Sequence, residues 1–98
     1  MDIHEAKKLI DQEEVTIVDI RDQASYHEVH IPKAIHFTDA NVEQFLKETA
    51  REKTLLCYCY HGYSSQNAAA FFKEQGFKTV YSMDGGFEAW RAVYPTVQ

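Results

Sequence analysis

Cys59 is the residue whose type and position in this sequence point most directly to chemistry. It stands at the end of an apolar run, residues 54–58, and a few residues before a predicted helix. A cysteine between a strand and a helix N-terminus faces backbone N–H groups and the positive end of the helix dipole, which lower the thiol pKa. We therefore predict a nucleophilic sulfur. An ordinary packed cysteine at the end of a strand is the alternative interpretation.

The segment after Cys59 is a candidate binding loop for an anion or a persulfide sulfur. Gly62 permits positive φ, so the loop can wrap its amides around one point. The other loop side chains supply hydroxyl groups and an imidazole, which is an unusual composition for a short connector. The predicted substrate-binding residues are Tyr60, His61, Gly62, Tyr63, Ser64 and Ser65.

Neither the second cysteine nor the histidines form a convincing metal or disulfide site. Cys57 lies two positions before Cys59, where a disulfide would be badly strained, so we expect two free thiols. Cys57 is interpreted as a core thiol, with a resolving cysteine as the alternative. The chain has no Cys-x-x-Cys partner, and the spacing of its histidines does not indicate a metal site, so we expect neither a metal nor a cofactor. The histidines considered are His4, His27, His30 and His36.

Two further groups of residues have structural interpretations. Asp19, Arg21 and Asp22 come at the end of a predicted strand, where a mutually paired Asp–Arg arrangement is favoured over a direct catalytic role. Trp90 and Phe87 lie at helical spacing and are expected in the core.

Strands and helices are predicted to alternate along the chain. Apolar and β-branched runs predict strands at residues 15–20, 34–37, 54–58 and 79–82. Helical spacing predicts five helices. The first two cover residues 3–12 and 24–28, with Asp2 and Asp22 as their caps. The third begins after Thr38 or Asp39, the fourth follows Ser64 or Ser65 and runs to Gly76, and the fifth covers residues 87–93. This alternation indicates an α/β fold with a mainly parallel sheet, in which ligands bind at the carboxyl ends of the strands.

Length and charge limit the remaining possibilities. The 98 residues, 45% of them hydrophobic, are enough for one core, so we expect a single domain over residues 1–98. The net charge of −5, without a compensating basic run, argues against nucleic acid or an anionic membrane as a partner. We find no apolar segment typical of a signal peptide or a membrane span and expect a reducing cytoplasm as the location.

Three segments, taken together, resemble the rhodanese family of sulfurtransferases. They are residues 18–22 with Tyr26 and residues 30–34, then the Cys59 loop, and then residues 80–90, the last reading Val-Tyr-Ser-Met-Asp-Gly-Gly-Phe-Glu-Ala-Trp. The resemblance implies a rhodanese-like three-layer α/β/α fold with a mainly parallel five-stranded sheet. It also implies that Cys59 takes the outer sulfur of thiosulfate, releases sulfite, and passes the sulfur from a persulfide to cyanide or a thiol acceptor. That acceptor could be a thioredoxin-like or other protein thiol.

The loop departs from the family pattern in one respect, and alternatives stay open. Many family members carry a basic residue five positions after the cysteine, where this chain has Ser64, and no Lys or Arg occurs from Tyr60 to Ser65. Anion binding would then depend on amides and hydroxyls, which leaves the sulfur donor open. A persulfide-accepting relay or partner-binding module, weakly active on small donors, is the second hypothesis. A cysteine phosphatase or arsenate reductase is the third, although such loops need an arginine clamp and one more residue.

Overall fold

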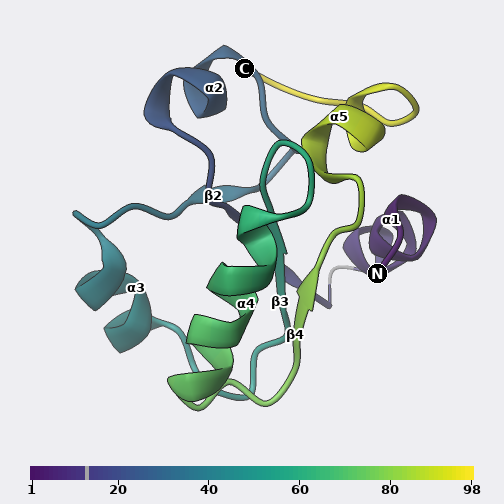
Figure 1. The fold of residues 1–98 in the computed structure, drawn as a ribbon. Helices are drawn as coiled ribbons and strands as arrows, with labels where there is room; N and C mark the ends of the chain where they lie inside the picture. The colour runs from purple at the N-terminus through teal and green to yellow at the C-terminus, as the bar shows by residue number, and fades with distance from the viewer. Residues whose placement is uncertain (13) are drawn as a thin grey trace.

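The chain folds into a four-stranded parallel sheet flanked by helices (Figure 1). The computed structural model describes residues 1–12 and 14–98. The strands are β1 (Thr16–Asp19), β2 (Ile35–His36), β3 (Leu55–Tyr58) and β4 (Val80–Ser82). The helices are α1 (Ile3–Asp11), α2 (Gln23–Glu28), α3 (Val42–Glu48), α4 (Ser64–Glu74) and α5 (Gly86–Arg91). Within the described residues, no helix combines the length and apolar character that a membrane crossing requires.

The sheet confirms the predicted α/β class but corrects the strand number that the family resemblance implied. In the described part of the chain the strand order is β2-β1-β3-β4, which gives four strands rather than five. The residue patterns had predicted four strands, and each observed strand lies within one of those apolar runs. Beyond α5, the β-type pairing is an isolated antiparallel bridge between His30 and Val97.

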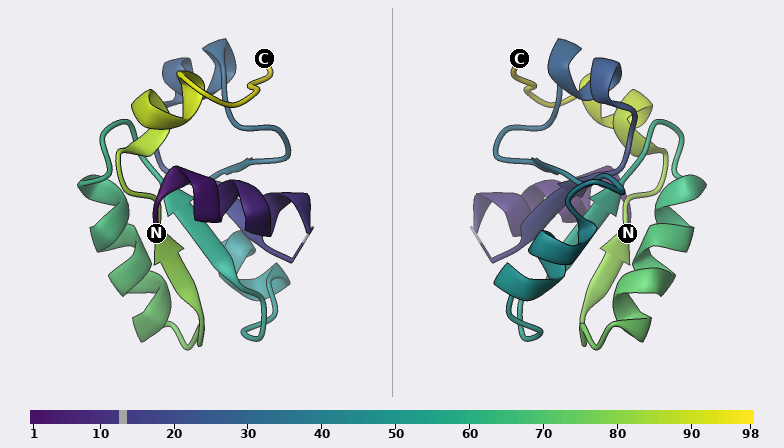
Figure 2. Two further views of the ribbon diagram at one scale, coloured as in Figure 1. Left: turned by 90° about the vertical axis from the view of Figure 1, so that its right-hand side faces the viewer. Right: turned by 90° about the vertical axis from the view of Figure 1, so that its left-hand side faces the viewer.

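The sheet separates two apolar cores, which gives the predicted α/β/α layering (Figure 2). Side chains of successive strand residues point to opposite faces. Leu56 and Tyr58 of β3 therefore pack with α1 and α5, whereas Leu55 and Cys57 pack with α3 and α4. As expected, Trp90 belongs to the core, on the α5 side. Both faces of β3 are covered, and its carboxyl end leads directly into the Cys59 loop.

Two of the predicted helix caps form, and the cap predicted for α3 does not. The carboxylate of Asp2 accepts from the amides of the first turn of α1, and Asp22 accepts from the Ser25 amide at 2.8 Å. At α3 the residue before the helix is Asn41, and its side chain caps no helix amide. The Asn41 side chain instead accepts through Oδ1 from the Thr38 backbone amide at 2.8 Å. Its Nδ2 donates to the His36 backbone carbonyl at 2.7 Å. Because these two bonds close the preceding turn, α3 begins later than the Thr38 or Asp39 start that the sequence suggested.

A buried ion pair lies at the carboxyl end of β1, and Tyr58 of β3 is hydrogen-bonded to it. Arg21 Nη2 lies 2.8 Å from Asp19 Oδ2, which confirms the predicted pairing. The Tyr58 hydroxyl donates to the same carboxylate at 2.5 Å. Burial, followed by the charge of Asp19, raises the pKa of Tyr58, so this hydroxyl keeps its proton. The Arg21 guanidinium also lies 4.0 Å from the ring centroid of Phe87, which connects the pair to α5.

Replacing Asp19 should be much more damaging than replacing its exposed neighbour Asp22. Asp19→Ala leaves the Arg21 charge buried without its counterion and the Tyr58 hydroxyl without its acceptor, and we expect the free energy of unfolding to fall by about 3–5 kcal/mol. Urea unfolding measures this loss. The matched control Asp22→Ala removes one helix cap and should cost clearly less. Equal losses in the two variants would contradict the proposed importance of the buried pair.

Candidate active site

The sulfur of Cys59 is the point on which the loop between β3 and α4 converges. The Gly62 amide donates to Sγ at 3.1 Å and the Ser65 amide does so at 3.3 Å. The Ser65 hydroxyl oxygen lies 3.4 Å from Sγ. Cys59 is buried, with 7% of its surface exposed. The loop therefore places two backbone amide donors and one serine hydroxyl around one sulfur atom, as expected for a cradle that holds negative charge.

Burial and these contacts act in opposite directions on the pKa of the Cys59 thiol. Burial raises its pKa, but the Ser65 hydroxyl and the amides of Ser65, Gly62 and His61 lower it by more, so the pKa lies below the ordinary thiol value. Hydrogen bonds to the charged form favour ionisation. The lowered pKa increases the fraction of thiolate, which is the nucleophilic form of cysteine.

The same sulfur serves as the acceptor at the start of α4. The first amides of a helix have no partner within the helix and need an outside acceptor. We predicted a serine cap, but the residue before α4 is Tyr63, whose side chain makes no capping bond. Ser64 and Ser65 are the first two helical residues, and the Ser65 amide donates to Cys59 Sγ. The serine-cap prediction was wrong because the sulfur occupies the acceptor position.

The loop carbonyls point the opposite way from its amides and are bound by α5. The Phe87 amide donates to the Cys59 carbonyl at 2.8 Å, and the Glu88 amide donates to the Tyr60 carbonyl at 3.0 Å. This approach requires glycine at position 86, where φ is +61° and a Cβ atom would lie 2.5 Å from the Tyr60 carbonyl oxygen. The first turn of α5 therefore holds the loop in a conformation that turns its amides toward the sulfur.

Most of the other side chains predicted to bind substrate lie on the exposed rim of the loop. The His61 Nδ1 and the Glu88 carboxylate lie 2.7 Å apart. Tyr63 is 78% exposed, and Tyr60 is partly exposed. Ser64 is exposed at the first residue of α4. Of the predicted set, the structure brings Gly62 and Ser65 into direct contact with Cys59 Sγ and arranges the others around the loop.

Two residues near the loop were missed by the sequence analysis. Ser82, at the end of β4, lies with its hydroxyl oxygen 2.7 Å from that of Ser65. Arg91 of α5 donates from Nη1 to the Tyr60 hydroxyl at 3.4 Å, and so brings a cation to a loop that has none of its own. Ser82 could have been predicted from its place at the carboxyl end of a strand, where ligands bind. Arg91 could have been predicted from its helical spacing to Phe87 and Glu88, which places it on the same face of α5.

Cys57 differs from Cys59 in the direction in which its pKa is shifted. It is fully buried in the core between the sheet and helices α3 and α4, and burial raises its pKa to about 12. Both cysteines are free thiols. Across residues 1–12 and 14–98, no group of three or more His, Cys, Asp or Glu side chains is arranged to hold a metal ion.

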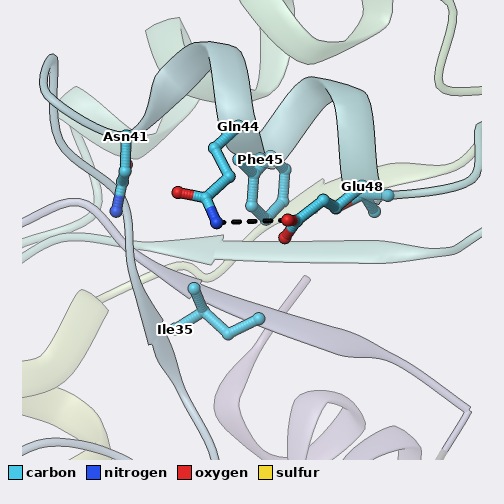
Figure 3. Close-up of a pocket in the computed structure, with 6 residues that line it drawn as sticks. Ile35, Asn41, Gln44, Phe45 and Glu48 are labelled. Carbon is cyan, nitrogen blue, oxygen red and sulfur yellow. Dashed lines mark hydrogen bonds between the residues drawn. The ribbon is translucent and has the colours of Figure 1, made fainter.

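A separate pocket of about 410 Å³ lies between α3 and β2 (Figure 3). Its wall includes Ile35 and Phe45, together with Gln44, whose amide donates to the Glu48 carboxylate at 3.1 Å. None of the residues that line it belongs to the Cys59 loop. Its walls supply a carboxylate and no cationic side chain, so we do not assign an anionic substrate to this pocket.

Comparison with known proteins identifies the class that this fold and this loop define. A rhodanese-like domain model matches residues 2–93, so the chain belongs to the rhodanese-like domain family. It is 48% identical over 92 residues to the thiosulfate sulfurtransferase GlpE of Coxiella burnetii, covering 94% of this chain and 86% of that protein. Its identity to the enzyme of the same name from Pseudoalteromonas translucida is also 48%, covering 94% and 88% of the two chains.

A solved structure supports the fold independently. The crystal structure of a rhodanese-related protein from Thermoplasma volcanium superposes with a TM-score of 0.84, at 22% identity, covering 99% of this chain and 95% of that one. At this level of identity the likeness establishes the shared fold.

The two cysteines should differ sharply in their reaction with iodoacetamide. Because the Cys59 pKa is lowered, its alkylation should accelerate with rising pH earlier than that of an ordinary cysteine thiol. Cys57, with its pKa of about 12, should remain unmodified in the folded protein. Peptide mass spectrometry after brief labelling across a pH series measures both rates. Alkylation of Cys57 at a rate comparable to Cys59 would contradict this assignment.

Proposed function

We propose that this protein is a thiosulfate sulfurtransferase in which Cys59 carries the transferred sulfur as a persulfide. The observation that carries the proposal is the convergence of the Gly62 amide, the Ser65 amide and the Ser65 hydroxyl on Cys59 Sγ. The names of the bacterial relatives, thiosulfate sulfurtransferase GlpE, agree with it. We assign Cys59 as the catalytic residue and the loop through Ser65 as the substrate-binding segment.

The proposed reaction has two half-reactions that balance without a cofactor. The Cys59 thiolate attacks the outer sulfur of thiosulfate, the bond between the two sulfurs breaks, and its electron pair leaves with sulfite. The negative charge then resides on the terminal sulfur of the Cys59 persulfide. An acceptor nucleophile attacks that terminal sulfur, the sulfur–sulfur bond to Cys59 breaks, and the thiolate is restored. Such double displacement gives ping-pong kinetics.

The surroundings of Cys59 support this chemistry through fixed dipoles. Donors that are already oriented toward a developing anion cost no reorganisation during the reaction, and low solvent exposure strengthens them. The loop amides meet this condition because the bonds from Phe87 and Glu88 hold its carbonyls in place. Arg91, at the rim, adds a guanidinium that can attract an anionic donor toward a protein whose net charge is −5.

The sulfur acceptor in this proposal is cyanide or a thiol. Tyr60, His61 and Tyr63 form an exposed rim, which is the surface that a protein thiol, including that of a thioredoxin-like protein, would meet. The first half-reaction requires Cys59 as a free thiolate, which fits the reducing cytoplasm that we propose as the location.

A persulfide relay is the second candidate function. In this alternative the domain accepts sulfur from a protein donor and acts weakly on small donors. The observations that favour it are the absence of Lys and Arg from Tyr60 to Ser65 and the 78% exposure of Tyr63 beside the loop. Rapid transfer from a persulfidated protein, combined with a very high KM for thiosulfate, would favour this alternative.

Treatment with thiosulfate should add one sulfur atom to the protein, and that addition should depend on Cys59. Cys59→Ser removes the nucleophile, so we expect neither the mass increase nor thiocyanate formation from cyanide. Intact-protein mass spectrometry and a thiocyanate assay provide the two readouts. The control Cys57→Ala removes the buried thiol and should retain both. Sulfur addition or turnover in Cys59→Ser would refute the assignment of Cys59.

Arg91 should affect the rate at which Cys59 reacts with the negatively charged donor thiosulfate, but not its rate of reaction with a neutral reagent. We expect Arg91→Ala to slow persulfide formation by thiosulfate severalfold, because the rim loses its guanidinium, and to weaken the salt dependence of that rate. Alkylation of Cys59 by neutral iodoacetamide should be unchanged. Lys73→Ala, in the last turn of α4, removes the same charge away from the loop and is the matched control. Equal slowing in both variants would point to net charge rather than to the position of Arg91.

A further inference from the structure

Ser82 forms the outer end of a chain of hydroxyl groups that leads to the sulfur of Cys59. Its oxygen lies 2.7 Å from the Ser65 hydroxyl oxygen, and that oxygen lies 3.4 Å from Cys59 Sγ. Ser65 is fully buried, so its hydroxyl bonds with the protein and not with bulk water. Ser82 lies on β4, adjacent to the strand that carries the nucleophile, and is not part of the Cys59 loop.

The direction of the hydrogen bonds follows from the charge on the sulfur. A hydroxyl group donates one proton and accepts through its lone pairs, whereas a thiolate only accepts. When Cys59 is ionised, Ser65 must therefore donate to Sγ, and the bond between the serines must run from Ser82 to Ser65. When Cys59 is protonated, the thiol donates to Ser65, and the Ser65 proton is free to turn toward Ser82.

Ser65 alone does not ensure that its hydroxyl proton points toward a thiolate at Cys59. A serine in the first turn of a helix can direct its hydroxyl proton to a nearby backbone carbonyl. Donation from Ser82 occupies a lone pair of the Ser65 oxygen. It also makes the Ser65 hydroxyl a stronger donor to the sulfur, because linked hydrogen bonds polarise one another. We propose that Ser82 is a positioning residue, whose hydroxyl donates to Ser65 and thereby directs the Ser65 proton to the sulfur of Cys59.

The backbone holds Ser82 in register for this role. Ser82 pairs with Cys57 across the parallel ladder of β3 and β4, and the amide of the following residue, Met83, donates to the Cys57 carbonyl at 3.0 Å. The sheet thus positions the Ser82 hydroxyl beside the first turn of α4. The inference rests on the proposed function only for its effect on sulfur transfer, because the reactivity of the Cys59 thiol is measurable without a sulfur donor.

The Cys59 pKa in Ser82 variants tests the proposal directly. We expect Ser82→Ala to raise the pKa by about one unit, which lowers the thiolate fraction about tenfold at pH values well below the pKa. Ser82→Thr keeps the hydroxyl and should restore the lower value. Tyr81→Phe removes a hydroxyl from the preceding strand residue, which is partly exposed, and serves as the matched control. The pH dependence of iodoacetamide alkylation measures all four proteins, and thermal unfolding shows whether each is folded.

The change in pKa is specific to Ser82 only if the neighbouring charges are unaltered. Ser82→Ala leaves in place every ionisable group on the loop and on the elements packed against it. They include Tyr60 and Tyr63 in the loop, His61, Glu88 and Arg91 at the rim, Asp19, Arg21 and Tyr58 at the strand ends, Cys57 in β3, and Tyr81, Asp84 and the N-terminal amino group beside Ser82.

A double-mutant cycle with Ser65→Ala separates positioning from an independent effect. If Ser82 acts through Ser65, then Ser82→Ala adds no further rise in pKa once Ser65→Ala is present. An unchanged pKa in Ser82→Ala, a rise matched by Tyr81→Phe, or a full additional rise in the double variant would each overturn the proposal.

Sulfur transfer provides a second readout with a distinct meaning. Below the Cys59 pKa, Ser82→Ala should slow persulfide formation by thiosulfate in proportion to the lost thiolate, and raising the pH should recover the rate. If the wild-type protein formed no persulfide, the proposed function would fail while the alkylation result still decided the role of Ser82.

Discussion

The opposed directions of the loop amides and loop carbonyls are the feature on which the site depends. The amides of Gly62 and Ser65 can face Cys59 Sγ because the carbonyls of Cys59 and Tyr60 face the other way. Buried carbonyls need donors, and the first turn of α5 supplies them. The close approach excludes any Cβ atom at position 86. The sulfur environment is therefore set as much by α5 as by the loop itself.

The position of α5 depends in turn on a buried ion pair at the strand ends. Arg21 is paired with Asp19 and covers the ring of Phe87, whose amide binds the Cys59 carbonyl. The first predicted strand and the last predicted helix thus meet beside the nucleophile. A charge pair that makes no contact with the sulfur still contributes to the site because it supports the helix that orders the loop.

The two cysteines lie two positions apart, yet their thiol pKa values are shifted in opposite directions. Cys57 lies within β3 and Cys59 directly follows it, and burial acts to raise the pKa of both thiols. Only Cys59 has donors that offset this effect, since it lies past the last ladder position, where the chain turns and the next helix begins. The lowered pKa of Cys59 is therefore a property of the turn and the helix terminus rather than of cysteine in this strand.

Local sequence patterns were enough to predict the α/β alternation, the four strand segments, the Asp2 and Asp22 caps, the Asp19–Arg21 pair and the place of Cys59 between strand and helix. Those features follow from local periodicity and short-range chemistry. The acceptor at the start of α4 was mispredicted because a sulfur atom from the preceding loop replaces the expected serine oxygen. Ser82 and Arg91 reach the site through strand register and helix docking. Only the tertiary structure decided those positions, because they bring together residues far apart in the chain.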